Sequence, residues 1–159
     1  MKIDIICVGK LKEDFHVKAV EEYKKRLSAY CKLEIIELQD EKTPDGASAA
    51  EELKIKATEG KRIIKAIKDD ARVIALAIEG KQLTSEEFAG MLEKTGVEGC
   101  GHIQFIIGGS LGLSDEVLKK SDLLLSFSKL TFPHQLMRTI LLEQIYRGYR
   151  INCNQPYHK

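Results

Sequence analysis

Five short apolar runs, with segments of helical period between them, restrict the fold of this chain more than any other feature of its sequence. The runs are rich in Ile, Val and Leu, as expected of strands that are covered on both faces. They are Ile3–Val8, Leu33–Leu38, Val73–Ile78, Ile103–Ile107 and Leu123–Phe127. Because strands and helices alternate along the chain, the sequence predicts an α/β fold with a mostly parallel sheet flanked by helices on both faces.

Capping signals indicate where four of the helices begin. Ser48–Glu51 and Thr84–Glu87 have the capping-box pattern, in which a hydroxyl and a carboxylate satisfy free main-chain N–H groups. Ser114 is suited to cap a short fourth helix. Pro133 is suited to the first turn of the last helix, where its missing N–H costs nothing.

Size and composition favour one globular domain over residues 1–159. With 43% hydrophobic and 31% charged residues, the chain is neither disordered nor collagen-like. No apolar run approaches the roughly 20 residues of a membrane span. No basic-then-apolar leader precedes the first strand, so we expect a soluble cytoplasmic protein without membrane association.

Neither the cysteines nor the histidines show the spacing of a metal site. The four cysteines lie far apart without a CxxC pair, which disfavours a zinc ribbon or a redox dithiol and predicts thiols in a reducing cytoplasm. His16, His102 and His134 have no mutual ligand spacing, so we expect no metal.

Charge is unevenly distributed along a nearly neutral chain. The formal net charge is +1, but residues 1–128 sum to −3 and residues 129–159 to +4. A basic segment on a near-neutral body indicates a local contact with a polyanion rather than general binding of nucleic acid.

Ligands of open α/β sheets bind beyond the carboxyl ends of the strands. Glycine or hydroxyl residues follow four of the predicted strands, at Val8–Lys10, Glu79–Lys81, Gly108–Gly112 and Ser126–Phe132. Gly108–Gly112 lies between a strand and a helix, but it matches neither GxGxxG nor a P-loop. A dinucleotide site, a structural turn and a site for another adenosine-type ligand all remain open for this loop.

The stretch from Phe127 to Arg138 is harder to explain as structure alone. It places two phenylalanines, two hydroxyls and a lysine in a turn before the last helix. Individually these residues could cover the end of the sheet, and Thr131 could cap the helix. Together they favour a loop that binds a ligand.

The last helix carries a pair of charged candidates, Glu143 and Arg147, four residues apart. One interpretation is a surface ion pair. The other is a row of arginines, with Arg138 and Arg150, that is oriented by a carboxylate and faces phosphate.

The helical pattern ends after Gly148, so we expect an extended tail over residues 152–159. Tyr157 and His158 lie in that tail. They are either disordered terminal residues or a nucleotide contact, in which an aromatic ring stacks on a base beside a titratable imidazole.

Several of these stretches together resemble one known family from end to end. The sequence resembles the bacterial large-subunit ribosomal RNA pseudouridine-N3-methyltransferases, small members of the SPOUT, or trefoil-knot, class. The matching stretches are Ile6–Lys10, Glu79–Ser85, Phe105–Gly109, Ser126–Gln135 with Arg138, Glu143–Arg147 and Pro156–Lys159.

The resemblance implies a C-terminal trefoil knot whose loops hold S-adenosyl-L-methionine. Such threading is rare among proteins, and the strand pattern does not indicate it. Carried over by position, the cofactor contacts are Leu76, Gly108, Phe127, Ser128, Lys129, Leu130, Thr131 and Phe132.

The implied reaction is methyl transfer to N3 of a pseudouridine in 23S ribosomal RNA of the assembled ribosome. His158, or a water held by Glu143 or Tyr157, is the candidate acceptor of the N3 proton. Tyr157 would orient the base, and Arg147 with Arg138 would hold phosphates. The resemblance also implies a homodimer in which the tail of one subunit reaches the pocket of the other.

Two other functions remain possible at this point. A non-catalytic ribosome-binding factor would use the same basic tail, but it would not need the Phe127–Phe132 loop. Another nucleotide-binding α/β enzyme would use Gly108–Gly112 and would prefer NAD or ATP to S-adenosylmethionine.

Overall fold

A computed structural model describes residues 1–159. Five strands form one sheet in the order β2-β1-β4-β3-β5, and every neighbouring pair is parallel. The strands are β1 (Lys2–Val8), β2 (Lys32–Leu38), β3 (Arg72–Gln82), β4 (His102–Ile107) and β5 (Leu123–Ser126). The helices are α1 (Asp14–Leu27), α2 (Ala49–Ala66), α3 (Ser85–Val97), α4 (Asp115–Lys120) and α5 (His134–Asn152). The predicted α/β class is confirmed.

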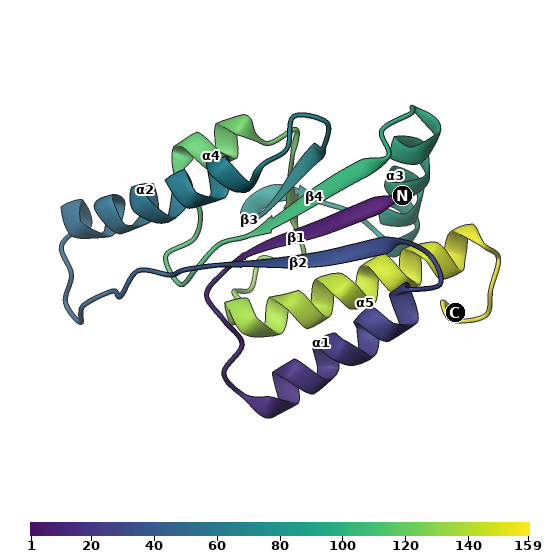
Figure 1. Ribbon diagram of the computed structural model, residues 1–159, viewed down its shortest axis with the longest axis horizontal. Coiled ribbons are helices and arrows are strands. Elements are labelled where there is room, and N and C mark those ends of the chain that lie inside the picture. The colour runs from purple at the N-terminus through teal and green to yellow at the C-terminus, as the bar shows by residue number, and fades with distance from the viewer.

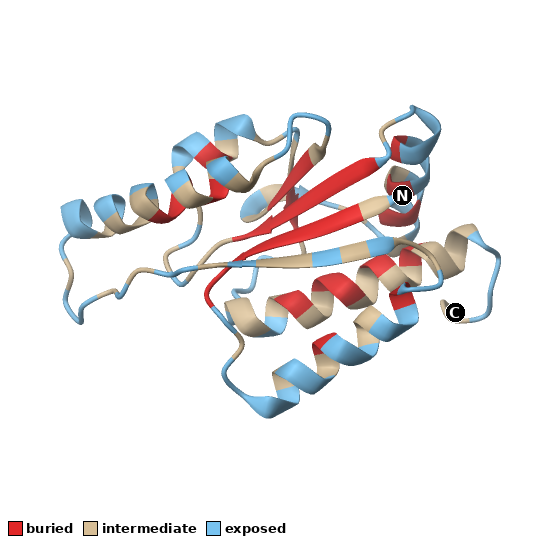
Figure 2. Ribbon diagram, viewed as in Figure 1, coloured by how far each residue is buried: buried red, intermediate tan, exposed pale blue.

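Helices cover both faces of the sheet (Figure 1). On one face, α1, α3 and α5 pack on β1 and β4 through a cluster that includes Leu27, Phe88 and Leu141. On the other face, α2 and α4 pack through a smaller cluster that includes Ile63 and Val117. Figure 2 shows the central strands buried, as their apolar sequences require. Because all five strands are parallel, their carboxyl ends meet at one edge of the sheet, together with the loops that follow the strands.

Ser48 and Thr84 form the predicted capping boxes, and Ser114 caps α4. The position of Pro133 differs by one residue from the prediction, because α5 begins at His134 and Pro133 precedes it with extended backbone, ψ 134°.

The end of α5 corrects the sequence prediction. The helix continues past Gly148 to Asn152 instead of ending at the glycine. Gly148 is buried against α3, where a Cβ would lie 3.0 Å from Leu92 and 3.5 Å from Ala89. Asn152 donates a hydrogen bond from Nδ2 to the carbonyl of Ala89 at 2.9 Å. The glycine is thus a point of close helix contact and not a helix end.

The pairing of β3 with β5 also departs from the simple pattern. β3 continues beyond Ile78 to Gln82, because β5 pairs first with Ile74–Leu76 and again with Lys81–Gln82. The residues between these two parts leave the ladder and return to it. A Cβ at Gly80 would lie 2.6 Å from the main chain of Leu124, so only glycine fits this approach. Phe127, predicted as strand, begins the loop after β5.

Candidate functional site

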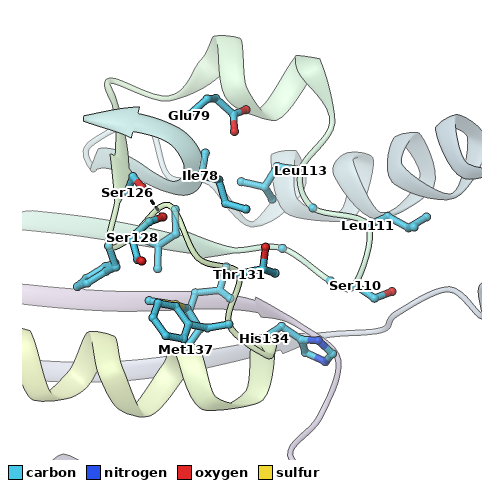
Figure 3. A pocket seen from close by; sticks show the side chains of 18 of the residues that line it. Ile78, Glu79, Ser110, Leu111, Leu113, Ser126, Ser128, Thr131, His134 and Met137 are labelled. Carbon is cyan, nitrogen blue, oxygen red and sulfur yellow. Dashed lines mark hydrogen bonds between the residues drawn. The ribbon is translucent and has the colours of Figure 1, made fainter. Parts of the chain in front are cut away.

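A cavity of about 710 Å³ lies at the carboxyl edge of the sheet (Figure 3). Its walls come from the end of β3, the loop after β4, the loop after β5 and the first turn of α5. Ile78 and Leu113 line one side in Figure 3, and Thr131 and Met137 line the other. A mostly apolar cavity of this size is typical of sites for nucleoside-sized ligands.

Seven of the eight predicted cofactor contacts line this cavity. They are Leu76, Gly108, Phe127, Ser128, Leu130, Thr131 and Phe132. Lys129, the eighth, is not among the lining residues. The two segments that the sequence singled out, the glycine loop and the loop before α5, thus form opposite walls of one cavity.

The main chain of the loop Phe127–Phe132 has few partners of its own. None of its main-chain N–H or C=O groups bonds to another main-chain group. Two hydroxyls provide the only bonds: Ser126 Oγ donates to Ser128 O at 3.1 Å, and the Leu130 N–H donates to Ser128 Oγ at 2.9 Å. These bonds shape the loop and leave most of its polar main-chain groups available to a ligand, since such groups need partners when they are covered.

The two ends of the loop Gly108–Gly112 lie close together. A Cβ at Gly108 would lie 2.9 Å from the main chain of Gly112 and 3.0 Å from Leu113. The helix after this loop begins with Asp115 and Glu116. Because acidic residues at a helix N-terminus repel anions, this end does not suit a pyrophosphate. The dinucleotide interpretation is therefore disfavoured, and an adenosine-type ligand without phosphates is favoured.

Three ionisable residues of the wall were not among the predicted site residues. They are Lys56 from α2, Glu79 from β3 and His134 from α5. Burial and the neighbouring Arg138 lower the pKa of His134, so it is neutral at physiological pH. Glu79 follows a predicted strand and His134 lies in the stretch from Phe127 to Arg138, so sequence patterns already indicated both positions as parts of a ligand site. No sequence pattern indicated Lys56, which lies within a helix.

Arg138 has a different role from the one predicted. Its side chain is 1% exposed, and it donates to Glu37 at 2.6 Å and to the carbonyl of Gly9 at 2.6 Å. These bonds fix the start of α5 to the carboxyl ends of β1 and β2. The predicted phosphate contact is wrong for this residue, because a buried guanidinium with two internal partners is not open to RNA.

The four catalytic candidates come together in one cluster at the far end of α5. Glu143 Oε1 accepts bonds from Arg147 Nη2 at 2.6 Å and from the Tyr157 hydroxyl at 3.0 Å. The guanidinium of Arg147 also lies 4.8 Å from the centre of the Tyr157 ring. His158 contacts Arg147 through Nδ1 at 3.3 Å and Glu86 through Nε2 at 2.7 Å. The tail residues Tyr157 and His158 are thus held against the protein.

The hydrogen bonds within this cluster indicate which ring nitrogen of His158 carries the proton. A guanidinium only donates, so Nδ1 of His158 accepts from Arg147 and Nε2 donates to Glu86. The pKa of Glu86 is lowered by its own main-chain N–H and by His158. Burial, with hydrogen bonds to Tyr23 and Glu143, raises the pKa of Tyr157 far above neutrality. Tyr157 therefore remains a hydrogen-bond donor at physiological pH and is not a base.

The cavity lies at the start of α5, and the cluster lies toward its other end, from which the C-terminal tail continues (Figure 1). Met137 lines the cavity, and Arg147 follows ten residues later on the same helix. At 1.5 Å per residue this corresponds to about 15 Å along the axis. The tail of one chain consequently does not reach its own cavity in this arrangement.

A buried carboxylate supports the glycine loop from α2. Glu59 is 5% exposed, and its Oε1 accepts the N–H of Glu41 at 3.0 Å. Its Oε2 lies 3.1 Å from where a Cβ at Gly109 would be. Burial, together with the carboxylates of Asp40 and Glu41, raises the pKa of Glu59. This side chain joins the loop after β2 to the loop after β4.

Replacing Glu59 by Gln should stabilise the protein increasingly as the pH rises. The native state holds the Glu59 proton above the ordinary pKa of 4.5, so wild-type stability falls as pH rises through that window. Gln keeps the acceptor for Glu41 and does not titrate. Thermal unfolding between about pH 4 and pH 8 should show a growing advantage of E59Q. A constant difference across this range, or the same trend in the exposed control E93Q, would contradict the assignment.

Two further features of the chain bear on its chemistry. No group of three or more His, Cys, Asp or Glu side chains is placed to hold a metal ion. No helix is both long and apolar enough to cross a bilayer.

Comparison with known proteins identifies close relatives. A family model described as predicted SPOUT methyltransferase matches residues 1–158. The chain is 64% identical to "Ribosomal RNA large subunit methyltransferase H" of Bifidobacterium adolescentis and 60% identical to "Ribosomal RNA large subunit methyltransferase H 1" of Clostridium perfringens strain SM101. Both alignments cover 100% of each protein.

A solved structure supports the fold. It is that of a probable methylase family protein from Haemophilus influenzae Rd KW20, with a TM-score of 0.55 and 14% identity. The match covers 99% of this chain and 70% of that one. At this identity the likeness is one of fold alone.

Proposed function

The chain belongs to the SPOUT methyltransferase family, and from that premise we propose that it methylates N3 of a pseudouridine in 23S ribosomal RNA of the assembled bacterial ribosome. S-adenosylmethionine is the proposed methyl donor. The observation that carries the proposal is the cavity between the glycine loop and the loop Phe127–Phe132, with its free main-chain groups. A ribosome-binding factor without catalytic activity has no use for such a cavity.

The lining of the cavity fits the chemical parts of this donor. Leu76, Leu130 and Phe132 provide apolar surface for an adenine, and the main chain of Phe127–Phe132 provides hydrogen-bonding groups for its ring nitrogens. Lys56 and Glu79 are the cation and the anion of the wall, so they suit the carboxylate and the ammonium of an amino-acid moiety. When bound, the donor supplies a methyl group on a positively charged sulfur.

The tail cluster performs the remaining chemistry in this proposal. N3 of the pseudouridine must lose a proton as its bond to the methyl carbon forms. Nδ1 of His158 has a lone pair that it shares with Arg147, and it can accept that proton once the bond is released. Tyr157 stacks on the base with its ring, since its one hydroxyl proton is donated to Glu143. Glu143 and Arg147 hold Tyr157 in place.

A homodimer would join the two halves of the site. Because one chain keeps its cluster and its cavity apart, the tail of a second copy would supply the cluster to each cavity. Exposed apolar side chains support such an interface: Phe15 on α1, Leu136 on α5 and Leu130 on the cavity loop are 66%, 37% and 73% exposed. The starts of α1 and α5 adjoin, since the Lys12 N–H donates to Gln135 at 3.2 Å.

The proposal includes the trefoil knot of the family. β3 pairs with β5 in two separate parts, and Gly80 contacts the main chain of Leu124. Both observations support a β5 that passes through the loop between the two paired parts of β3. The substrate would place the protein in the cytoplasm, where bacterial ribosomes are.

Methyl transfer from labelled S-adenosylmethionine tests this function. Assembled ribosomes, isolated subunits and free ribosomal RNA, each with or without the pseudouridine, serve as substrates. We expect label as N3-methylpseudouridine, and only in assembled ribosomes. Label at another atom, or none on any ribosomal RNA, would overturn the proposal.

The variant Gly108→Val provides the matched negative control and a separate prediction. Its side chain would collide with Gly112 and Leu113, where even a Cβ lies within 3.0 Å. The wall of the cavity must shift, so we expect cofactor affinity to fall at least about a hundredfold, which corresponds to about 3 kcal/mol. Calorimetric titration measures this loss. Gly90→Val, on the open side of α3, has no such neighbour and should bind like wild type.

A further inference from the structure

The arginines that the sequence placed against phosphate are occupied within the chain. Arg138 is buried with Glu37, and Arg147 is paired with Glu143. Arg150 donates to the Tyr30 hydroxyl at 3.2 Å and to the carbonyl of Pro156 at 3.1 Å. The basic tail therefore offers few free cations, and an enzyme that acts on ribosomal RNA needs cations elsewhere, because phosphate contacts provide most of the affinity.

Free cations gather on the outer side of α2. Lys54, Lys61 and Lys65 lie within about 40° of one another around the helix axis and span about 16 Å along it. All three are exposed, and none has a carboxylate within 4.0 Å. The only acid between residues 53 and 68 is Glu59, which is buried on the inner side. We call Lys54, Lys61 and Lys65 the lysine stripe.

This arrangement does not help the helix itself. Lys61 and Lys65 are like charges at i,i+4, which destabilises a helix by a few tenths of a kcal/mol. The exposed lysines of the other face differ. Lys18 and Lys24 on α1 each pair with an acid at 2.8 Å, and Lys94 on α3 pairs with Glu98 at 3.7 Å. On α2 every exposed lysine lacks an acidic partner, whereas on α1 only Lys25 does.

The helix that carries the lysine stripe also reaches the cavity. Lys56 of α2 lines the cavity wall, and the lysine stripe lies about 140–180° around the helix axis from it, on the side of α2 that faces away from the cavity. The proposed dimer contact lies on the face of the sheet that α1 and α5 cover, and α2 covers the other face (Figure 1). Its outer side is exposed along its length (Figure 2). A strand that enters the cavity with its target base could therefore continue over α2.

We propose that the lysine stripe binds the phosphates of ribosomal RNA that flanks the target nucleotide. The inference rests on the proposed function for the identity of the RNA. Lysine suits this task as a point charge that contacts phosphate without reading sequence. Such a contact would position the substrate and would leave the choice of base to the cavity and the tail cluster.

The test compares two triple variants with equal changes of charge. K54Q/K61Q/K65Q removes the lysine stripe, and K18Q/K24Q/K94Q removes three exposed lysines that are paired with acids. Binding to ribosomes and to free ribosomal RNA is measured by co-sedimentation at several salt concentrations. S-adenosylmethionine binding and thermal unfolding are measured for both variants and should match wild type, since five of the six residues are exposed and the Lys24 side chain is 39% exposed.

For the stripe variant we expect ribosome affinity at 0.1 M salt to fall by roughly ten- to a few hundredfold. The slope of log affinity against log salt should decrease by about 2–3, from roughly 0.7–0.9 per lost phosphate contact. The control should change the slope by less than about 1. Equal slopes for the stripe variant and wild type would overturn the inference.

Three other outcomes separate the possible errors. If the stripe variant loses affinity for ribosomes but not for free RNA, the stripe binds a ribosomal protein and the inference is wrong. If wild type binds RNA with the expected slope but methylates none, the proposed reaction fails while the stripe stands. If wild type binds neither ribosomes nor RNA, both fail.

Discussion

Removal of residues 154–159 should lower the single-turnover rate of methyl transfer by about 10²–10⁴-fold, because it removes the proposed proton acceptor and the residue that orients the base. Cofactor affinity should remain at the wild-type level, since none of these residues lines the cavity. The single variants H158A and Y157F should each show part of the loss. K159A, the adjacent exposed residue, serves as the control. A truncated protein with wild-type turnover would contradict the role of the tail.

Mixing two impaired variants, measured against the residual activity of each alone, tests whether the site is shared between subunits. G108V has an intact tail and a defective cavity. H158A has an intact cavity and a tail without the proposed proton acceptor. In a random mixture half of the dimers are mixed, and each mixed dimer has one complete site of two, so about a quarter of wild-type activity should return. If both halves act within one chain, no activity returns. This outcome would remove the composite site and leave cofactor binding unaffected.

The second large effect concerns stability. Arg138→Met leaves Glu37 and the carbonyl of Gly9 without their partner at the point where α5 joins the sheet. Breaking a buried charge pair costs about 3–5 kcal/mol, and partial exposure of Glu37 reduces this to about 2–4 kcal/mol. Tm should fall by about 5–15 °C. Cofactor affinity should fall as well, because His134 and Met137 of the same helix turn line the cavity.

Arg138→Lys tests the geometry of this anchor against its charge. Lysine keeps the charge but cannot reproduce the two directed bonds, so we expect an intermediate Tm. If Arg138 were a phosphate contact, both variants would melt like wild type and lose only RNA affinity. Differential scanning calorimetry and the co-sedimentation assay together separate these possibilities.

Local patterns were enough to predict the architecture. The apolar runs and the capping boxes at Ser48 and Thr84 gave the element order and the parallel sheet. The loops at Gly108 and Phe127 could be singled out because each follows a strand. Their meeting in one cavity follows from the common direction of the strands.

Other features could not be predicted, because they depend on contacts between distant segments. Gly148 resembles a helix end in sequence, and only its contact with α3 explains why the helix continues. Arg138 resembles a surface arginine until Glu37, about a hundred residues away, is placed beside it. Likewise, β3 is extended by a second pairing with β5, which no local pattern encodes.

The cavity has a consequence for the timing of activity during protein synthesis. Its walls are contributed by α2, β3 and the loop after β4, and they are closed by β5 and α5, which follow later in the chain. A nascent chain whose last helix is still inside the ribosome lacks one wall and the anchor of Arg138. We expect no cofactor to bind in that state. On the proposed function, the enzyme therefore gains activity only after release from the particle that made it, and it acts on ribosomes in trans.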